Sequence, residues 1–193
     1  MSSLMEVKPG PGQLQANHDH AQYLTFMLGG EMFAIGILAI KEIIEYGGLT
    51  EVPMMPECIR GVINLRGAVV PVMDLSARFG KAVTAVTKRT CIVIVEVDNG
   101  DAQQVVGVVV DAVNAVLEIP HSEIEPAPSF GARIRTDFIA GMGKVNGRFV
   151  ILLNVDNVLS TEDLGALTDV ALESACTWQS GRAGPPGKKI MNE

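Results

Sequence analysis

The stretch IRGVINLRGAVVPVMD at residues 59–74 decides the fold, since two apolar runs flank the two-residue turn Arg66-Gly67 and together predict a β-hairpin. The stretch IAGMGKVNGRFVILLN at residues 139–154 has the same form and turns at Asn146-Gly147. The two stretches align without a gap at a spacing of 80 positions. The matching pairs are Ile59 with Ile139, Gly61 with Gly141, Gly67 with Gly147, and Asp74 with Asn154. We interpret them as an internal repeat; the alternative is chance similarity between two glycine-rich hairpins.

Two further hairpins are predicted outside the repeat. The first joins residues 23–28 to residues 31–35 through Gly29-Gly30, and the second joins residues 91–97 to residues 104–110 through Asn99-Gly100. Short β-rich runs joined by such turns predict an all-β protein. Closing each set of about five short strands into a small barrel would remove exposed edges, and packing two barrels together would supply the burial that each lacks alone.

Two longer segments are predicted to be helical. Ile37, Ile40 and Ile44 would share one face of a short amphipathic helix after the second strand. The run Ser160-Thr161-Glu162-Asp163 has the form of a capping box before an apolar stripe, which predicts a C-terminal helix over about 161–175. Both repeat stretches also end in a residue type that caps helices, so a short helix is expected after each.

Composition indicates a packed globule with two polar tails. Of the 193 residues, 48% are hydrophobic and 19% charged, which is incompatible with disorder over most of the length. Residues 1–21 and 176–193 are rich in Gly, Pro and polar residues, so they are expected to be a flexible leader and tail around a folded part at 22–175. No apolar run is long enough to span a membrane and no secretion signal is visible, which predicts a cytoplasmic protein.

The charge and the cysteines exclude several classes of function. A formal net charge of -7 provides no broad basic field, so nucleic acid is not an expected partner. The three cysteines are far apart and none belongs to a metal-binding spacing, which predicts reduced thiols and no bound metal.

Residues for catalysis are not apparent either. His18 and His20 lie in the leader, His121 follows a proline in a probable loop, and Gly143-Lys144 lacks the other residues of a phosphate loop. We therefore expect a non-catalytic protein without a cofactor. The residue that needs explanation is Arg66, because a turn between apolar strands rarely requires Arg. Its guanidinium group is either solvated or offers its donors to a partner protein.

The folded span resembles the CheW family, the coupling proteins of bacterial chemotaxis. The resemblance is carried by segments spread over both halves of the chain. They are FAI at 33–35, IKEI at 40–43, Val52-Pro53, IRGVINLRG at 59–67, VPVMDL at 70–75, VGVVVD at 106–111 and FIAG at 138–141. The asparagine-leucine-arginine-glycine turn is the specific part. Gly36 departs from the pattern, because many family members carry an acidic residue there.

The resemblance implies both a fold and a function. The fold would be two intertwined five-stranded SH3-like barrels, which we place at about 22–85 and about 86–160, followed by the C-terminal helix. The function would be to link the regulatory domain of the histidine kinase CheA to the cytoplasmic tips of methyl-accepting chemoreceptors, at membrane-associated arrays and without insertion into the membrane. The alternatives are an adaptor of a parallel chemosensory array, for pilus motility or surface sensing, or a small-ligand-binding barrel.

The resemblance also implies a set of partner-binding residues. Asn64, Leu65, Arg66 and Gly67 form the signature turn, and Gly61 precedes it. Further contacts are expected near the receptor groove and in the second-barrel segments. These are Ile40, Glu42, Ile92, Gly107, Val113 and Val116. An apolar strand residue in this set is more often part of the core than of an interface.

Overall fold

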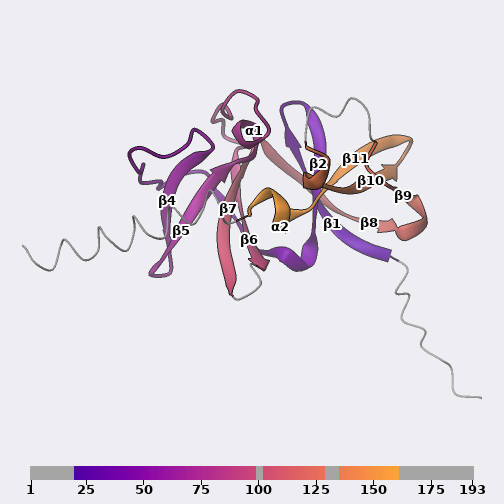
Figure 1. Ribbon diagram of the computed structural model, residues 1–193, viewed down its shortest axis with the longest axis horizontal. Helices are drawn as coiled ribbons and strands as arrows, with labels where there is room; N and C mark the ends of the chain where they lie inside the picture. Colours follow the sequence, from indigo (N-terminus) through magenta and orange to yellow (C-terminus); the bar gives the residue numbers. More distant parts are fainter. Residues whose placement is uncertain (1–19, 99–101, 129–134, 161–193) are drawn as a thin grey trace, which may run out of the picture.

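The computed structural model describes residues 20–98, 102–128 and 135–160, and it is all-β as predicted (Figure 1). The strands are β1 His20–Leu28, β2 Glu31–Gly36, β3 Ile40–Glu45, β4 Ile59–Leu65, β5 Ala68–Asp74, β6 Cys91–Asp98, β7 Gln103–Val110, β8 Ala112–Pro120, β9 Ile124–Glu125, β10 Ile139–Val145 and β11 Arg148–Leu153. Helical turns are short. They are η1 Ile37–Ala39, α1 Leu75–Arg78, η2 His121–Glu123, η3 Thr136–Phe138 and α2 Val155–Val158.

The strands form two sheets that exchange segments of the chain. The five-stranded sheet has the order β3-β6-β7-β5-β4, and the six-stranded sheet has the order β8-β1-β2-β11-β10-β9. In Figure 1 the two sheets stand side by side, with the first strands of the chain crossing into the sheet that holds the last ones. The sheets therefore do not follow the expected division at residue 85. Parallel pairing of β2 with β11 carries the N-terminal hairpin into the C-terminal sheet, and the two-residue β9 adds a sixth strand to it.

All four predicted hairpins are present. β1 pairs with β2, β4 with β5, β6 with β7 and β10 with β11, each antiparallel. The repeat is also structural, because β4 and β10 each shift register at the matching place, after Ile59 and after Ile139. Asp74 and Asn154 cap α1 and α2 through their side chains, as predicted.

The helix expected around Ile40 is wrong. Only residues Ile37–Ala39 form a 3₁₀ turn, and Ile40–Glu45 is a strand paired with β6. Apolar residues four positions apart share a face in both a helix and a strand, so the spacing of Ile40 and Ile44 did not discriminate. Isoleucine favours the strand because it is branched at Cβ. The concern that Gly36 loosens a helix therefore does not apply.

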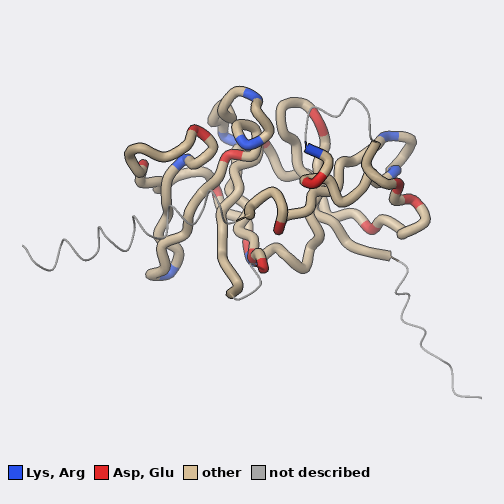
Figure 2. The backbone as a smooth tube through the Cα atoms, viewed as in Figure 1, with Lys and Arg blue, Asp and Glu red and all other residues tan. Residues whose placement is uncertain are grey.

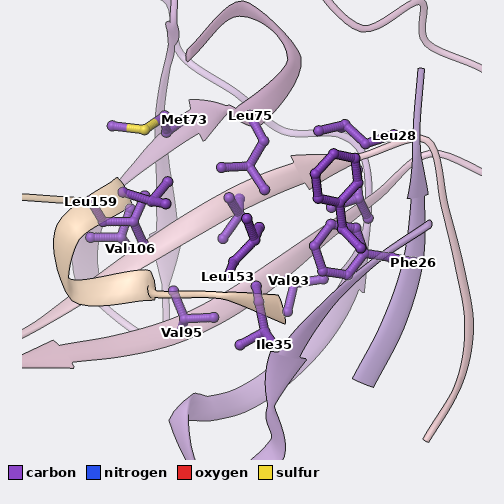
Figure 3. Packing of buried hydrophobic residues seen from close by; sticks show 14 of the residues in the cluster. Phe26, Leu28, Ile35, Met73, Leu75, Val93, Val95, Val106, Leu153 and Leu159 are labelled. Atoms are coloured by element: carbon purple, nitrogen blue, oxygen red, sulfur yellow. The ribbon is translucent and has the colours of Figure 1, made fainter. Parts of the chain in front are cut away.

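Three clusters of buried residues fill the molecule. The largest lies between the sheets and includes Phe26, Phe33, Met73 and Val93, all without solvent exposure (Figure 3). The other two lie on the opposite faces of the sheets and use matching positions of the repeat. In one cluster these are Val70 and Val72, and in the other Val150 and Leu152. Both faces of the central strands are thus buried, which explains their continuous apolar sequence.

The expected tails fall mostly outside the described residues. The leader predicted to end at residue 21 is too long, because β1 already begins at His20. The tail at 176–193 and the helix predicted over about 161–175 lie outside the described residues. No helix in the described ranges is long and apolar enough to cross a membrane.

Candidate partner-binding site

The Arg66-Gly67 turn is held in one conformation. Both residues have positive φ angles, 52° and 89°, which is the geometry of a type I′ hairpin turn. The side chain of Asn64 reinforces the turn, since its Oδ1 accepts a hydrogen bond from the Gly67 amide at 2.8 Å. Arginine is uncommon in this backbone region, where glycine and asparagine carry less strain. The chain therefore holds Arg66 in a costly position on a rigid support.

Arg66 forms an ion pair across the five-stranded sheet. Its Nη2 lies 3.1 Å from Oε2 of Glu42 on β3, so the structure brings together two residues that the sequence placed in the site. The Arg66 side chain is 80% exposed and that of Glu42 26%. A pair this exposed contributes about 0–1 kcal/mol to folding. Most guanidinium donors remain accessible, so the pair can orient Arg66 toward a partner.

The edges of the same sheet are linked beside this pair. Thr50 and Val62 exchange two backbone hydrogen bonds of 2.8 and 2.9 Å, and Arg60 donates to the hydroxyl group of Tyr46 at 2.9 Å. Gly61 makes the approach possible, because a Cβ atom there would lie 2.3 Å from the Thr50 carbonyl oxygen. Gly61 is thus buried, and its lack of a side chain positions the strand that leads to the turn.

An apolar strip lies on the same strand as Glu42 but on the opposite face of the sheet, since Glu42 is paired with Ile94. The register of β3 shifts at Lys41, which places Ile40 opposite Val95 and Ile43 opposite Val93. Residues opposite each other share a face of the sheet, so both isoleucines lie at the edge of the cluster between the sheets. Ile43 is 43% exposed and Leu38, in η1, is 99% exposed. Neither Ile43 nor Leu38 was predicted as a site residue, because this segment was expected to be a helix.

The remaining candidates are divided between the two sheets. Ile92 is fully buried, and Gly107 is buried against it, since a Cβ atom at Gly107 would lie 2.8 Å from Cγ2 of Ile92. These two residues belong to the core of the five-stranded sheet, together with the partly buried Leu65. Val113 and Val116 lie on β8, an edge strand of the other sheet, where Val113 packs on the central cluster and Val116 is 47% exposed.

The described residues contain few of the arrangements that chemistry requires. No three His, Cys, Asp or Glu side chains of this part of the chain converge as metal ligands. Cys58 and Cys91 are half-buried and reduced, and His121 is exposed in η2. A hollow of about 660 Å³ opens where β1 begins, beside η1 and α2, and Gly36 is one of its walls.

Comparisons with known proteins cover most of the described chain. Residues 22–163 match the model of a protein family described as the CheW-like domain. The chain is 35% identical over 150 residues to the chemotaxis protein CheW of Klebsiella aerogenes, covering 78% of this chain and 88% of that protein. It is 34% identical over 142 residues to the chemotaxis protein CheW of Rhizobium meliloti, covering 74% and 89%. The crystal structure of the scaffolding protein TtCheW from Thermoanaerobacter tengcongensis superposes with a TM-score of 0.67 at 32% identity, over 74% of this chain and 94% of that one.

Proposed function

The chain belongs to the CheW family, and from this premise we propose that it links the histidine kinase CheA to the cytoplasmic tips of methyl-accepting chemoreceptors. Its place as a chemotaxis coupling protein, an adaptor without catalysis, follows from the family and from the scaffolding protein that it resembles. The finer assignment of partners rests on one observation. A mostly exposed Arg66 is fixed by Glu42 on edge strand β3, and the other face of that strand carries the exposed Ile43.

The site suits a helical receptor segment. A helix presents apolar residues along one face and charged residues beside them. The strip around Ile40, Ile43 and Leu38 would cover the apolar face from one side of β3. Arg66 would pair with a carboxylate or with the carbonyl groups at a helix end from the other side. Val113 and Val116, on the edge of the six-stranded sheet, would be further contacts with the receptor.

The kinase would occupy a different surface. Two sheets with matching hairpins provide two related faces, so one protein can hold two partners at once. Binding to both would keep the protein in the cytoplasm at membrane-associated arrays through its partners. A parallel system, for pilus motility or surface sensing, would use the same geometry with a different kinase and receptor.

The test measures the affinity of the full chain for a receptor cytoplasmic fragment and for the CheA regulatory domain, both from the same organism, by isothermal titration calorimetry. Replacing Arg66 with Ala should weaken receptor binding about tenfold, because a charge-assisted contact at an interface is worth roughly 1.4 kcal/mol or more. The matched control is Arg148→Ala, an exposed arginine beside the other repeat turn, which should leave the affinity for the receptor fragment unchanged.

Two outcomes would count against the proposal. If Arg66→Ala keeps its affinity for both partners, the site assignment is wrong. If the folded wild-type chain binds neither partner, the protein serves another array or is a ligand-binding barrel. The latter predicts that a small molecule raises the melting temperature of the chain.

A further inference from the structure

One segment carries a charge opposite in sign to that of the whole chain. Between Asp74 and Glu96 there is no acidic residue, although the whole chain carries a formal charge of -7. The basic residues in this interval are Arg78, Lys81, Lys88 and Arg89. In Figure 2 blue segments gather on α1 and on the loop beside it. The basic loop, defined as residues 82–89, is therefore a positive patch on an acidic protein.

The basic loop is fixed by buried hydrogen bonds. Thr84 is 5% exposed, and its amide and hydroxyl groups both donate to the carboxylate of Asp74, at 2.8 and 2.9 Å. Asp74 has no solvent exposure and also accepts from the amides of α1. At the other end the Thr87 amide donates to the hydroxyl group of Thr90 at 2.8 Å. Although the loop contains no strand or helix, these hydrogen bonds fix its conformation. Little conformational entropy would therefore be lost when it binds a partner.

The loop exposes apolar and basic groups together. Val83 is 39% exposed and Val86 52%. Lys88 and Arg89 are exposed, and no acidic group in the described ranges lies within ion-pair distance of either. Lys81, just before the loop, is already paired with Glu31 at 2.7 Å. Two positive charges therefore remain available beside two valines.

The main chain of the loop is available as well. Neither Val83 nor Val86 forms a backbone hydrogen bond with another residue of the described part. Free amide and carbonyl groups of a loop can pair with those of an incoming segment. Such pairing would supply affinity, while the side chains would supply specificity.

We propose that the basic loop docks an extended acidic segment of a partner protein. Carboxylates of that segment would pair with Lys88 and Arg89, and its alternate apolar side chains would cover Val83 and Val86. A membrane surface fits less well. The whole chain is negatively charged, and the loop lacks the aromatic or leucine side chains that insert into lipid.

The loop is separate from the Arg66 site. Strand β5 runs from the Arg66-Gly67 turn to Asp74, which holds the loop. At about 3.3 Å per residue the two sites lie roughly 20 Å apart along this strand. Both can be occupied at once, so the acidic segment is a further partner element beyond the proposed coupling function.

The test is an NMR titration of the ¹⁵N-labelled full chain with a blocked peptide of alternating Glu and Val. Amide shifts should appear in residues 82–89 and decrease when salt is added, because the pairing is electrostatic. The double variant Lys88→Glu, Arg89→Glu should lose affinity about tenfold or more. Val83→Ser should lose less, which tests the apolar part independently.

The control uses two exposed basic residues of the hairpin β10–β11. Lys144→Glu with Arg148→Glu removes two exposed charges elsewhere and should leave peptide affinity unchanged. The proposal is overturned if no shifts appear at about 1 mM peptide, which half-saturates a site with a Kd of about 1 mM, or if the shifts lie at Lys144–Phe149. It is also overturned if a peptide with Lys in place of Glu binds equally. If the wild-type chain sediments with anionic vesicles and only the Lys88→Glu, Arg89→Glu variant does not, the loop binds lipid instead.

Discussion

The hairpins β4–β5 and β10–β11 have the same backbone and different surroundings. Arg66 and Asn146 occupy the same turn position with φ angles of 52° and 50°, and Ile59 and Ile139 are equally buried at 8% exposure. Yet of these two turn residues Arg66 alone pairs with a carboxylate, that of Glu42 on β3. The shared features make the fold, and the features that differ between the copies make the site.

The supports of the two hairpins differ in the same way. Gly61 lies against the backbone of Thr50, whereas Gly141 lies mainly against the side chain of Ile124. Asp74 accepts four hydrogen bonds, including two from Thr84, while Asn154 accepts one from the Asn157 amide. The first copy is therefore more rigidly held than the second.

The largest effect is expected for Gly61→Ala compared with Gly141→Ala. An added Cβ at Gly61 would lie 2.3 Å from the Thr50 carbonyl oxygen, at a φ of 137° that other residues rarely adopt. We expect a loss of about 3–5 kcal/mol in the free energy of unfolding at Gly61 and about 1 kcal/mol at Gly141, where Ile124 can shift. Urea unfolding measures both. Equal losses would show that the edges of the five-stranded sheet do not depend on this contact.

A smaller difference is expected between the caps, Asp74→Ala and Asn154→Ala. Removing Asp74 leaves the buried donors of Thr84 and of α1 without acceptors, so the free energy of unfolding should fall by about 2–4 kcal/mol. Removing Asn154 deletes one exposed cap bond, worth about 1 kcal/mol. Thermal and urea unfolding should rank the two variants. A cost at Asn154 as large as at Asp74 would contradict the greater rigidity of the first copy.

Much of the fold was predictable because its signals are local. Two-residue turns such as Arg66-Gly67 and capping residues such as Asp74 specify their own neighbourhood, and all four hairpins and both caps were found from them. The strand at Ile40–Glu45 was not, because the spacing of Ile40 and Ile44 fits a helix and a strand alike. Which sheet each hairpin joins depends on long-range pairing, such as β2 with β11, which a local pattern does not contain.

The candidate site was predictable to a similar extent. Arg66 was predicted from its residue type, since the backbone of a tight turn does not require an arginine. The register shift at Lys41 was not predicted. Because this shift decides on which face Ile43 lies, the exposed Ile43 was not predicted as a site residue either. Ile92 was included although it is fully buried, because a strand buried on both faces has no alternation to separate core from surface.

The smallest effect on stability is expected when the turn residues are exchanged, as Arg66→Asn or Asn146→Arg. Asn tolerates a positive φ better than Arg, so Arg66→Asn relieves strain while it removes an exposed ion pair. The two terms offset each other, and the free energy of unfolding should change by less than about 0.5 kcal/mol, with a similarly small loss for Asn146→Arg. Receptor-fragment affinity should fall for Arg66→Asn alone. If Asn146→Arg alters that affinity as much, the second hairpin also contacts the receptor, and the division between a shared scaffold and a single specialised turn is wrong.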